Sequence, residues 1–238
     1  MKKTFLLSCL MLAAMPVMAA YTGRVYVDKN KNGVFDQSEK PLAGIKVSDG
    51  LNVVETAADG SFTLPGHERE RFIFITTPSG YKTFNRHYHK IEKKQSGYDF
   101  GLIPYSGRIR KDGSHRYIHI TDTEIFNTEN HADWVNNVHD YARNEQAAFI
   151  IHTGDICYEK GLKAHIKLMN TENMDCPVFY CIGNHDLVKG KYGEELFESI
   201  YGPVYYSFDA GNVHYVVTPM PPEETMLQAI LPMTSVVG

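Results

Sequence analysis

Three apolar segments of the sequence each lead into a polar residue that can bind a metal ion, and this repetition most constrains the fold. They are Tyr117–Thr121 before Asp122, Ala148–His152 before Gly154-Asp155, and Pro177–Tyr180 before Cys181-Ile-Gly-Asn-His-Asp186. Short apolar runs of this kind are typical of buried strands. In a parallel α/β sheet the carboxyl ends of the strands meet at one edge, where ligands bind. We therefore expect an α/β sheet that gathers these side chains into a cation site.

The polar residues resemble a known family. Asp122-x-Glu124, Gly154-Asp155 and Gly183-Asn-His-Asp186 are similar, in this order, to the first three blocks of the calcineurin-like metallophosphoesterases. The resemblance covers roughly Arg116 to Val217. Glu124 stands where the family usually has a histidine, and the family's last two histidine blocks are missing.

The resemblance implies a dinuclear metal site that hydrolyses phosphate mono- or diesters with two divalent ions (Mn, Fe, Zn or Mg). Asp155 matches the bridging carboxylate, Asp122 a ligand of the first metal and Asn184 a ligand of the second. His185 matches the residue that contacts the phosphate and assists proton transfer, and Asp186 would orient it. Glu124 is either a ligand, favouring hard cations such as Mn²⁺ or Mg²⁺, or a bystander.

Several other histidines have ordinary structural explanations. His119 and His152 lie inside apolar strands, which favours hydrogen-bonded core positions over metal ligation. We predict surface positions for the histidines at 87, 89, 115, 131 and 139.

Around the three blocks, residues 107–238 alternate between strand and helix patterns. Helices are predicted from Trp134 to Ala142, with Tyr141 on the buried face, around Gly161 to Met174, and from Glu194 to Ile200. A hairpin is predicted over 205–217, turning at 210–212. This βαβ order implies a parallel sheet with right-handed crossovers. By resemblance, the region holds the first half of a two-sheet α/β sandwich.

Residues 21–105 predict a separate all-β sandwich, which resembles the N-terminal domain of an exported bacterial subgroup of the family. Short β-rich runs recur between turn signals such as Asp49-Gly and Asp59-Gly; they are 23–27, 44–48, 52–56, 61–64, 72–76 and 98–102.

A candidate calcium loop lies in this first domain. Residues 28–39 match the pattern D-x-[DN]-x-[DN]-G-x5-E. Oxygen atoms that could surround a calcium ion come from Asp28, Asn30, Asn32, the Val34 carbonyl, Asp36 and Glu39. The alternative is a polar hairpin loop that holds no metal.

The ends of the chain and its charge suggest where it works. Residues 1–20 have two lysines, an apolar core and a small-residue cleavage site, which predicts a signal peptide and an exported, periplasmic or extracellular protein without a stable membrane anchor. Cys157, Cys176 and Cys181 would remain as free thiols. A formal charge of −4 with both signs spread along the chain argues against nucleic acid as the main partner; the oligomeric state is left open.

Two further expectations concern function. After Met220 the β/α pattern fades, and we hypothesise a frameshift or a truncation that removes the later histidines. The chain as written would then be a poor enzyme or none. The competing class is an exported, calcium-stabilised adhesion or binding module without catalysis.

Overall fold

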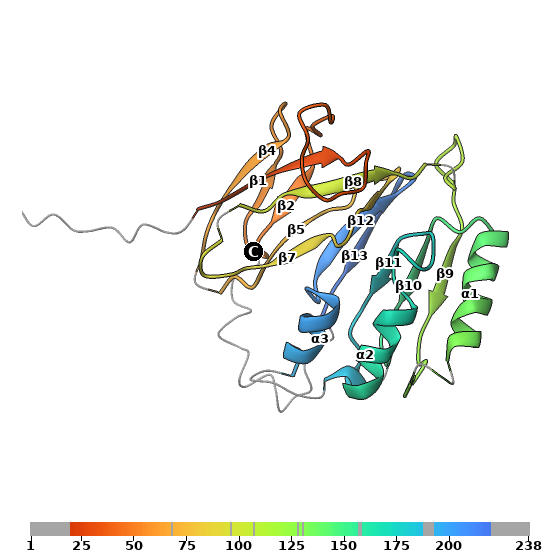
Figure 1. Ribbon diagram of the computed structural model, residues 1–238. Coiled ribbons are helices and arrows are strands. Elements are labelled where there is room, and N and C mark those ends of the chain that lie inside the picture. The colour runs from red at the N-terminus through yellow and green to blue at the C-terminus, as the bar shows by residue number, and fades with distance from the viewer. Residues whose placement is uncertain are drawn as a thin grey trace, which may run out of the picture.

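In the computed structural model, residues 20–219 are described except 68, 96, 107, 128, 130, 157–158 and 188–192. The predicted signal peptide (apart from residue 20), Cys157 and the segment from Met220 onward, for which a frameshift was hypothesised, lie outside the described residues. Strands form one part of the molecule, and a mixed α/β region forms the other (Figure 1).

The first region is the predicted β-sandwich. Two four-stranded sheets, in the orders β4-β1-β8-β6 and β3-β2-β5-β7, enclose a core that includes Val25, Val47, Leu64 and Phe100. The strands are β1 (Ala20–Val27), β2 (Lys46–Ser48), β3 (Val53–Glu55), β4 (Ser61–Pro65), β5 (Phe72–Ile75), β6 (Tyr81–Thr83), β7 (Tyr88–Lys90) and β8 (Phe100–Pro104). The sequence did not predict β6 and β7, because each has three residues with a lysine among them and shows no alternating run.

The second region is the predicted α/β core. Its sheet has the order β11-β10-β9, and both strand pairs are parallel. The elements are β9 (Tyr117–Ile120), α1 (Ala132–Asn144), β10 (Phe149–His152), α2 (Glu159–Leu168), β11 (Val178–Tyr180), a 3₁₀ turn (Asn184–Asp186), α3 (Glu195–Tyr201), β12 (Tyr206–Ala210) and β13 (Val213–Val217).

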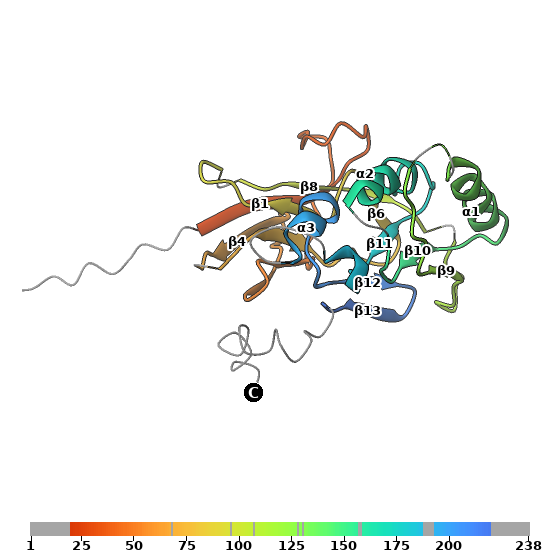
Figure 2. The same ribbon diagram turned by 90° about the horizontal axis from the view of Figure 1, so that it is seen from below.

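Alternating side chains of the parallel strands pack on two layers. Ile150 and Val178 face the helices, while Phe149 and Phe179 face the hairpin, where both rings pack on Phe208. The helices and the β12–β13 hairpin accordingly lie on opposite faces of the sheet (Figure 2). A strand buried on both faces reads as a continuous apolar run, which explains why these strands could be predicted.

The helices differ from the prediction in two places. Helix α2 ends at Leu168 rather than near Met174, and turns follow it. The Tyr141 side chain is 61% exposed, although Val135 and Ala142 of the predicted apolar face are buried. Tyr141 therefore does not belong to that face.

The two regions share an apolar interface. Phe72, Phe74 and Tyr88 of the sandwich join one core cluster with Phe179 and Phe208 of the α/β region. Around it, the Arg71 guanidinium lies 2.7 Å from the Glu198 carboxylate, whose side chain is 2% exposed. The backbone of Asp209 also donates to the Thr77 carbonyl at 2.8 Å. This apolar packing fixes how the sandwich sits on the hairpin.

Two cysteines of the α/β region do not form a disulfide bond. Cys176 and Cys181 are free thiols, as predicted, and burial raises the pKa of each to about 11. No helix within the described part of the chain combines the length and hydropathy that a membrane span requires.

Candidate metal centre

The three polar blocks follow β9, β10 and β11 and meet at the carboxyl edge of the parallel sheet. The backbone N–H of Asp122 donates to the Gly154 carbonyl at 3.1 Å. The N–H of Glu124 donates to the Asp155 carbonyl at 3.3 Å, and that of His185 to Asp155 Oδ1 at 3.0 Å. These bonds join all three loops, as expected from the prediction that the three blocks meet at one edge of the sheet.

Three acidic residues of this edge adopt a left-handed backbone conformation, which is unfavourable for residues other than glycine. Asp122, Glu124 and Asp155 have φ values of 53°, 43° and 50°. Non-glycine residues in this left-handed region cost free energy, and they concentrate at functional sites. The conformation is held by the loop-to-loop hydrogen bonds above.

Glycine is required at Gly183 because there is no space for a side chain, and not because of its backbone conformation. Its φ of −108° and ψ of 176° are open to any residue. A Cβ atom there would lie 2.1 Å from the Asp155 nitrogen and 2.2 Å from its Oδ1. Gly154 needs both properties, since its φ is 100° and a Cβ would lie 2.6 Å from Gly183. The two glycines thus let the second and third blocks touch.

Glu124 and His185 form a pair at this edge. The Glu124 Oε1 atom lies 3.2 Å from His185 Nδ1, and the two side chains are 48% and 36% exposed. Glu124 is therefore placed to act on His185, as well as being near the other carboxylates in sequence.

Asp186 is fully buried and ties the loops together. Its carboxylate accepts the backbone N–H groups of Gly183 at 2.9 Å and Ile156 at 3.0 Å. The contact with Ile156 holds the third block against the second, and the contact with Gly183 closes the turn of the third block itself. The predicted orienting role toward His185 stays a prediction.

His152 is a hydrogen-bonded core histidine, as predicted. Its Nδ1 accepts the N–H of Gly154 at 3.3 Å, and its Nε2 lies 2.9 Å from Thr123 Oγ1, which in turn donates to the Ile156 carbonyl. Burial lowers the pKa of His152 to about 4, against the attraction of Asp122. This neutral imidazole links the first block to the second.

His119 does not occupy a core position, and that prediction was wrong. It is exposed on the edge strand β9, where its Nε2 lies 2.7 Å from Thr153 Oγ1. No strand of the described chain covers this side of β9, so an apolar run did not guarantee burial.

The donor atoms at this edge suit a divalent cation. Asp122, Glu124 and Asp155 form no ion pair with any described lysine or arginine, and neither Oδ2 of Asp155 nor the Asn184 amide has a described hydrogen-bond partner. Carboxylate and amide oxygens are ligands for hard cations. Among described residues, no three carboxylate or imidazole ligand atoms of this edge lie within 4.8 Å of one another.

Comparison with protein-family models agrees with this geometry. Residues 115–221 match the model described as calcineurin-like phosphoesterase, and residues 29–104 match the model for the N terminal of calcineurin-like phosphoesterase. The chain belongs to the calcineurin-like phosphoesterases. A search of curated proteins gave no significant match. Membership of the family implies hydrolysis that depends on divalent metal ions.

The β-sandwich also contains the candidate calcium loop. The buried Asp28 carboxylate accepts the N–H groups of Asn32 at 3.2 Å and Gly33 at 2.9 Å. Glu39, 5% exposed, accepts the N–H groups of Lys29 and Asp36. Gly33 has a φ of 72°, as a sharp turn requires. The loop is thus wound around two acidic residues at its ends.

One further acidic cluster was missed by the sequence analysis, because its members are far apart in the chain. Asp49, His67 and Glu70 offer three ligand atoms within 4.8 Å of one another. However, the Arg69 N–H donates to His67 Nδ1 at 3.2 Å, and His67 Nε2 lies 3.4 Å from the Asp49 carbonyl oxygen. Glu70 accepts the Tyr21 hydroxyl. Glu70 also accepts the His67 backbone N–H, so the ligand atoms of this cluster are already engaged in hydrogen bonds.

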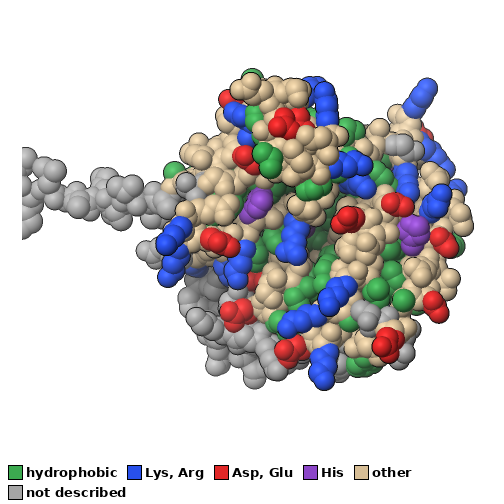
Figure 3. Space-filling model, viewed as in Figure 1, with side chains coloured by type: hydrophobic (Ala, Val, Ile, Leu, Met, Phe, Trp, Pro, Cys, Tyr) green, Lys and Arg blue, Asp and Glu red, His purple; other side chains and the backbone are tan. Residues whose placement is uncertain are grey.

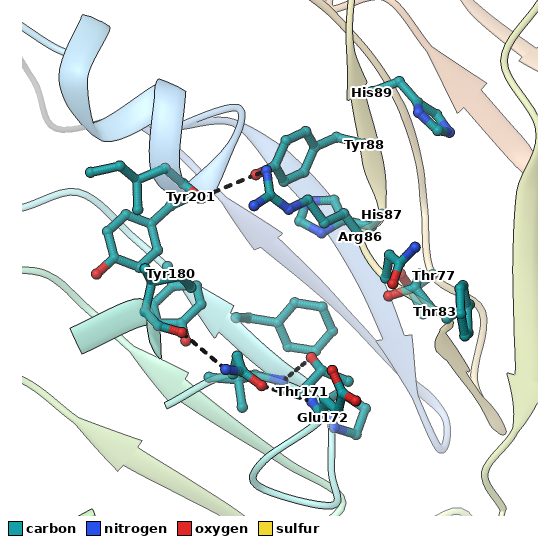
Figure 4. A pocket seen from close by; sticks show the side chains of 18 of the residues that line it. Thr77, Thr83, Arg86, His87, Tyr88, His89, Thr171, Glu172, Tyr180 and Tyr201 are labelled. Atoms are coloured by element: carbon teal, nitrogen blue, oxygen red, sulfur yellow. Dashed lines mark hydrogen bonds between the residues drawn. The ribbon is translucent and has the colours of Figure 1, made fainter. Parts of the chain in front are cut away.

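His87 is another departure from the predictions, since it lies between the two domains rather than on the surface. Its ring packs 4.4 Å from that of Tyr206, and burial together with nearby Arg86 lowers its pKa to about 3. It lines a cavity of about 610 Å³ between the sandwich and the α2–β11 region, with Arg86 and Tyr88 on one wall and Tyr180 and Tyr201 on the other (Figure 4). Burial here depends on the second domain, which local sequence does not reveal.

Proposed function

We propose that the protein hydrolyses phosphate mono- or diesters at the edge that holds Asp122, Asp155 and Asn184. One observation carries the proposal. Asp122, Glu124 and Asp155 have left-handed backbone conformations and no lysine or arginine partner among the described residues. The side-chain amide of Asn184 completes the set of candidate ligands. Family membership supplies the reaction class.

Within this proposal, Asp122 and Asp155 hold the cations together with Asn184. Two bound divalent ions supply positive charge for the phosphoryl oxygens and lower the pKa of a bound water. The chain itself contributes the fixed spacing of the ligands, because the loops are joined by the backbone bonds to Gly154 and Asp155.

His185 is the group that we assign to proton transfer. Its Nδ1 lies 3.2 Å from Glu124 Oε1, and we assign the proton transfer to the other ring nitrogen, Nε2. A protonated Nε2 can donate to the leaving-group oxygen, which contributes about 10²–10⁴ in rate for a general acid. We assign Glu124 the task of holding this imidazole in position.

The test is hydrolysis of an aryl phosphate and a bis-aryl phosphate with added Mn²⁺. Asp155→Ala should abolish turnover, and His185→Asn should lower kcat by about 10²-fold. Asp140→Asn, which removes an exposed carboxylate from α1, is the matched control and should leave the rate unchanged. Mn²⁺ binding that requires Asp155 but brings no turnover would favour the non-catalytic binding module instead.

We also propose a structural calcium ion in the loop from Asp28 to Glu39. The loop's acidic ends and its left-handed glycine support this, and residues Asn30, Asn32, Val34 and Asp36 would complete the oxygen shell. It would stiffen one end of the sandwich.

Export is a further proposal, supported by the composition of residues 1–20. N-terminal sequencing of the protein recovered from a bacterial periplasm should begin at residue 20 or 21. A cytoplasmic protein that begins at Met1 would refute it.

A further inference from the structure

A second, positively charged hollow lies at the opposite edge of the sheet from the candidate metal centre. It has a volume of about 480 Å³ and is lined by Arg108, Arg110, Lys111 and Arg116, with Glu145 as its one carboxylate. These residues carry a formal charge of +3 in a chain whose total is −4. Positive charge is therefore concentrated at this hollow, although the sequence suggested that both signs are spread evenly along the chain.

Two of these cations have structural partners. Arg108 Nη1 donates to the Ala147 carbonyl at 3.0 Å, and Arg116 Nη1 lies 2.8 Å from Glu145 Oε2. Both interactions lie just after the C-terminus of α1, where positive charge favours the helix dipole. Helix stabilisation therefore accounts for Arg108 and Arg116.

The other two cations are not accounted for in this way. No described carboxylate lies within 4.0 Å of the Arg110 guanidinium or of Lys111 Nζ. Arg110 makes one long hydrogen bond, 3.4 Å to Ser114 Oγ, while the neighbouring Asp112 accepts from Ser114. Both side chains are exposed at the hollow, and Lys and Arg side chains stand out over this loop at the upper right of Figure 3.

The loop that carries them is held in place before any ligand arrives. Ile109 and His115 form an antiparallel bridge, and the Arg110 N–H donates to the Ser114 carbonyl at 2.9 Å. From the β12–β13 turn, the Asn212 side chain donates to the Asp112 carbonyl at 3.0 Å. A preformed loop loses less entropy when it binds a ligand.

The hollow cannot share a single phosphate group with the metal centre. Arg116 precedes β9 and Asp122 follows it, so the two sites are separated by a strand of six residue steps, roughly 20 Å. The loop before β9 and the loop after it lie at opposite ends of the strand (Figure 1).

We propose that this hollow is an anion site for a phosphate-bearing group, separate from the site of hydrolysis. Arg110 and Lys111 supply the charge, and the anchored Arg108 and Arg116 shape the wall. Guanidinium and ammonium groups bind phosphate oxygens through charge-assisted hydrogen bonds. The volume exceeds that of a phosphate group alone, so the ligand is either a free phosphate ester or the head group of a lipid.

The test uses the whole protein after removal of metal ions, so that the candidate metal centre does not hold phosphate. Pyrophosphate is titrated by calorimetry into the wild type and into Arg110→Gln/Lys111→Gln. We expect the double variant to weaken binding by about tenfold or more. Lys93→Gln/Lys94→Gln removes the same charge from an exposed turn of the sandwich and should change binding less than about twofold.

A second arm separates the two ligand sources. Vesicles of phosphatidylglycerol and of phosphatidylcholine are sedimented with the same three proteins. Loss of binding by the Arg110/Lys111 variant on phosphatidylglycerol alone would identify a lipid head group, and loss on pyrophosphate alone a free phosphate ester. Equal binding by all three proteins, or no binding by the wild type in either arm, would overturn the proposal. Equal melting temperatures of the three proteins show that folding is intact.

Discussion

Replacing Gly183 by alanine perturbs the contact between the second and third blocks without changing any charge. The new Cβ would sit 2.1 Å from the Asp155 nitrogen and 2.2 Å from Oδ1. Ordinary contacts of a Cβ begin at about 3.4 Å, so the loops must part by on the order of 1 Å. The first bond to suffer is His185 N–H to Asp155 Oδ1, now 3.0 Å.

The expected cost follows from two effects. Overpacking a tight contact costs about 1–3 kcal/mol, and at about 2–4 °C per kcal/mol this predicts a melting temperature roughly 2–12 °C lower. A displacement near 1 Å of a ligand such as Asp155 should weaken Mn²⁺ binding by about 10–100-fold.

Gly193→Ala is the matched control. A Cβ at Gly193 would meet only the end of the Leu187 side chain, at 3.3 Å, which can move aside. Thermal melting and Mn²⁺ calorimetry are measured for both variants. If Gly183→Ala melts within about 1 °C of Gly193→Ala and binds Mn²⁺ as tightly, the close packing of the two blocks described here is wrong.

Three further predictions concern stability. Millimolar calcium should raise the melting temperature of the whole protein above its value in chelator, because a hundredfold excess over Kd adds about 2.7 kcal/mol to the free energy of unfolding. Asp28→Ala should remove the effect, and an unchanged melting temperature of the wild type would contradict calcium binding by the loop. His87 and His165 have pKa values lowered to about 3 by burial, with nearby Arg86 and His152 as lesser causes. The unfolded chain takes up these protons first, so stability should fall as pH drops from about 6.5 toward 3, by about 2 kcal/mol for each histidine at pH 5; equal urea midpoints at pH 5 and 7 would exclude this. Arg71→Met should cost about 1.5–3 kcal/mol, because the buried Glu198 carboxylate loses a charged partner at the domain interface, and a urea midpoint equal to the wild type would argue against it.

The parts of the fold predicted from the sequence are those with a local signal. The strands from Ala148 and Pro177 are apolar runs because both of their faces are covered, whereas the strand from Tyr117 is an apolar run at the sheet edge that is covered only in part. The residues after the three strands meet because parallel strands end at one edge. The order of the polar blocks therefore carried both the topology and the location of the candidate centre.

The misses depend on packing between distant segments. The predicted environments of His119 and His87 were both wrong, because β9 is the edge strand of its sheet and leaves His119 exposed, while Tyr206 covers His87 from the other domain. The requirement for glycine at Gly183 likewise comes from Asp155, 28 positions earlier in the chain. A single sequence shows local preferences along the chain, whereas these three features depend on contacts between residues that are far apart in the sequence.

The measurement that most directly tests the central claim is Mn²⁺ binding by the metal-free protein, followed by calorimetry or by the electron paramagnetic resonance of free Mn²⁺. The wild type should bind Mn²⁺, and Asp122→Asn and Asp155→Asn should each weaken that binding by about tenfold or more, because each removes a carboxylate ligand. Asp140→Asn should bind as the wild type does. Mn²⁺ binding that is unchanged by Asp155→Asn, or absent from the wild type, would contradict the assignment of this edge as the metal centre.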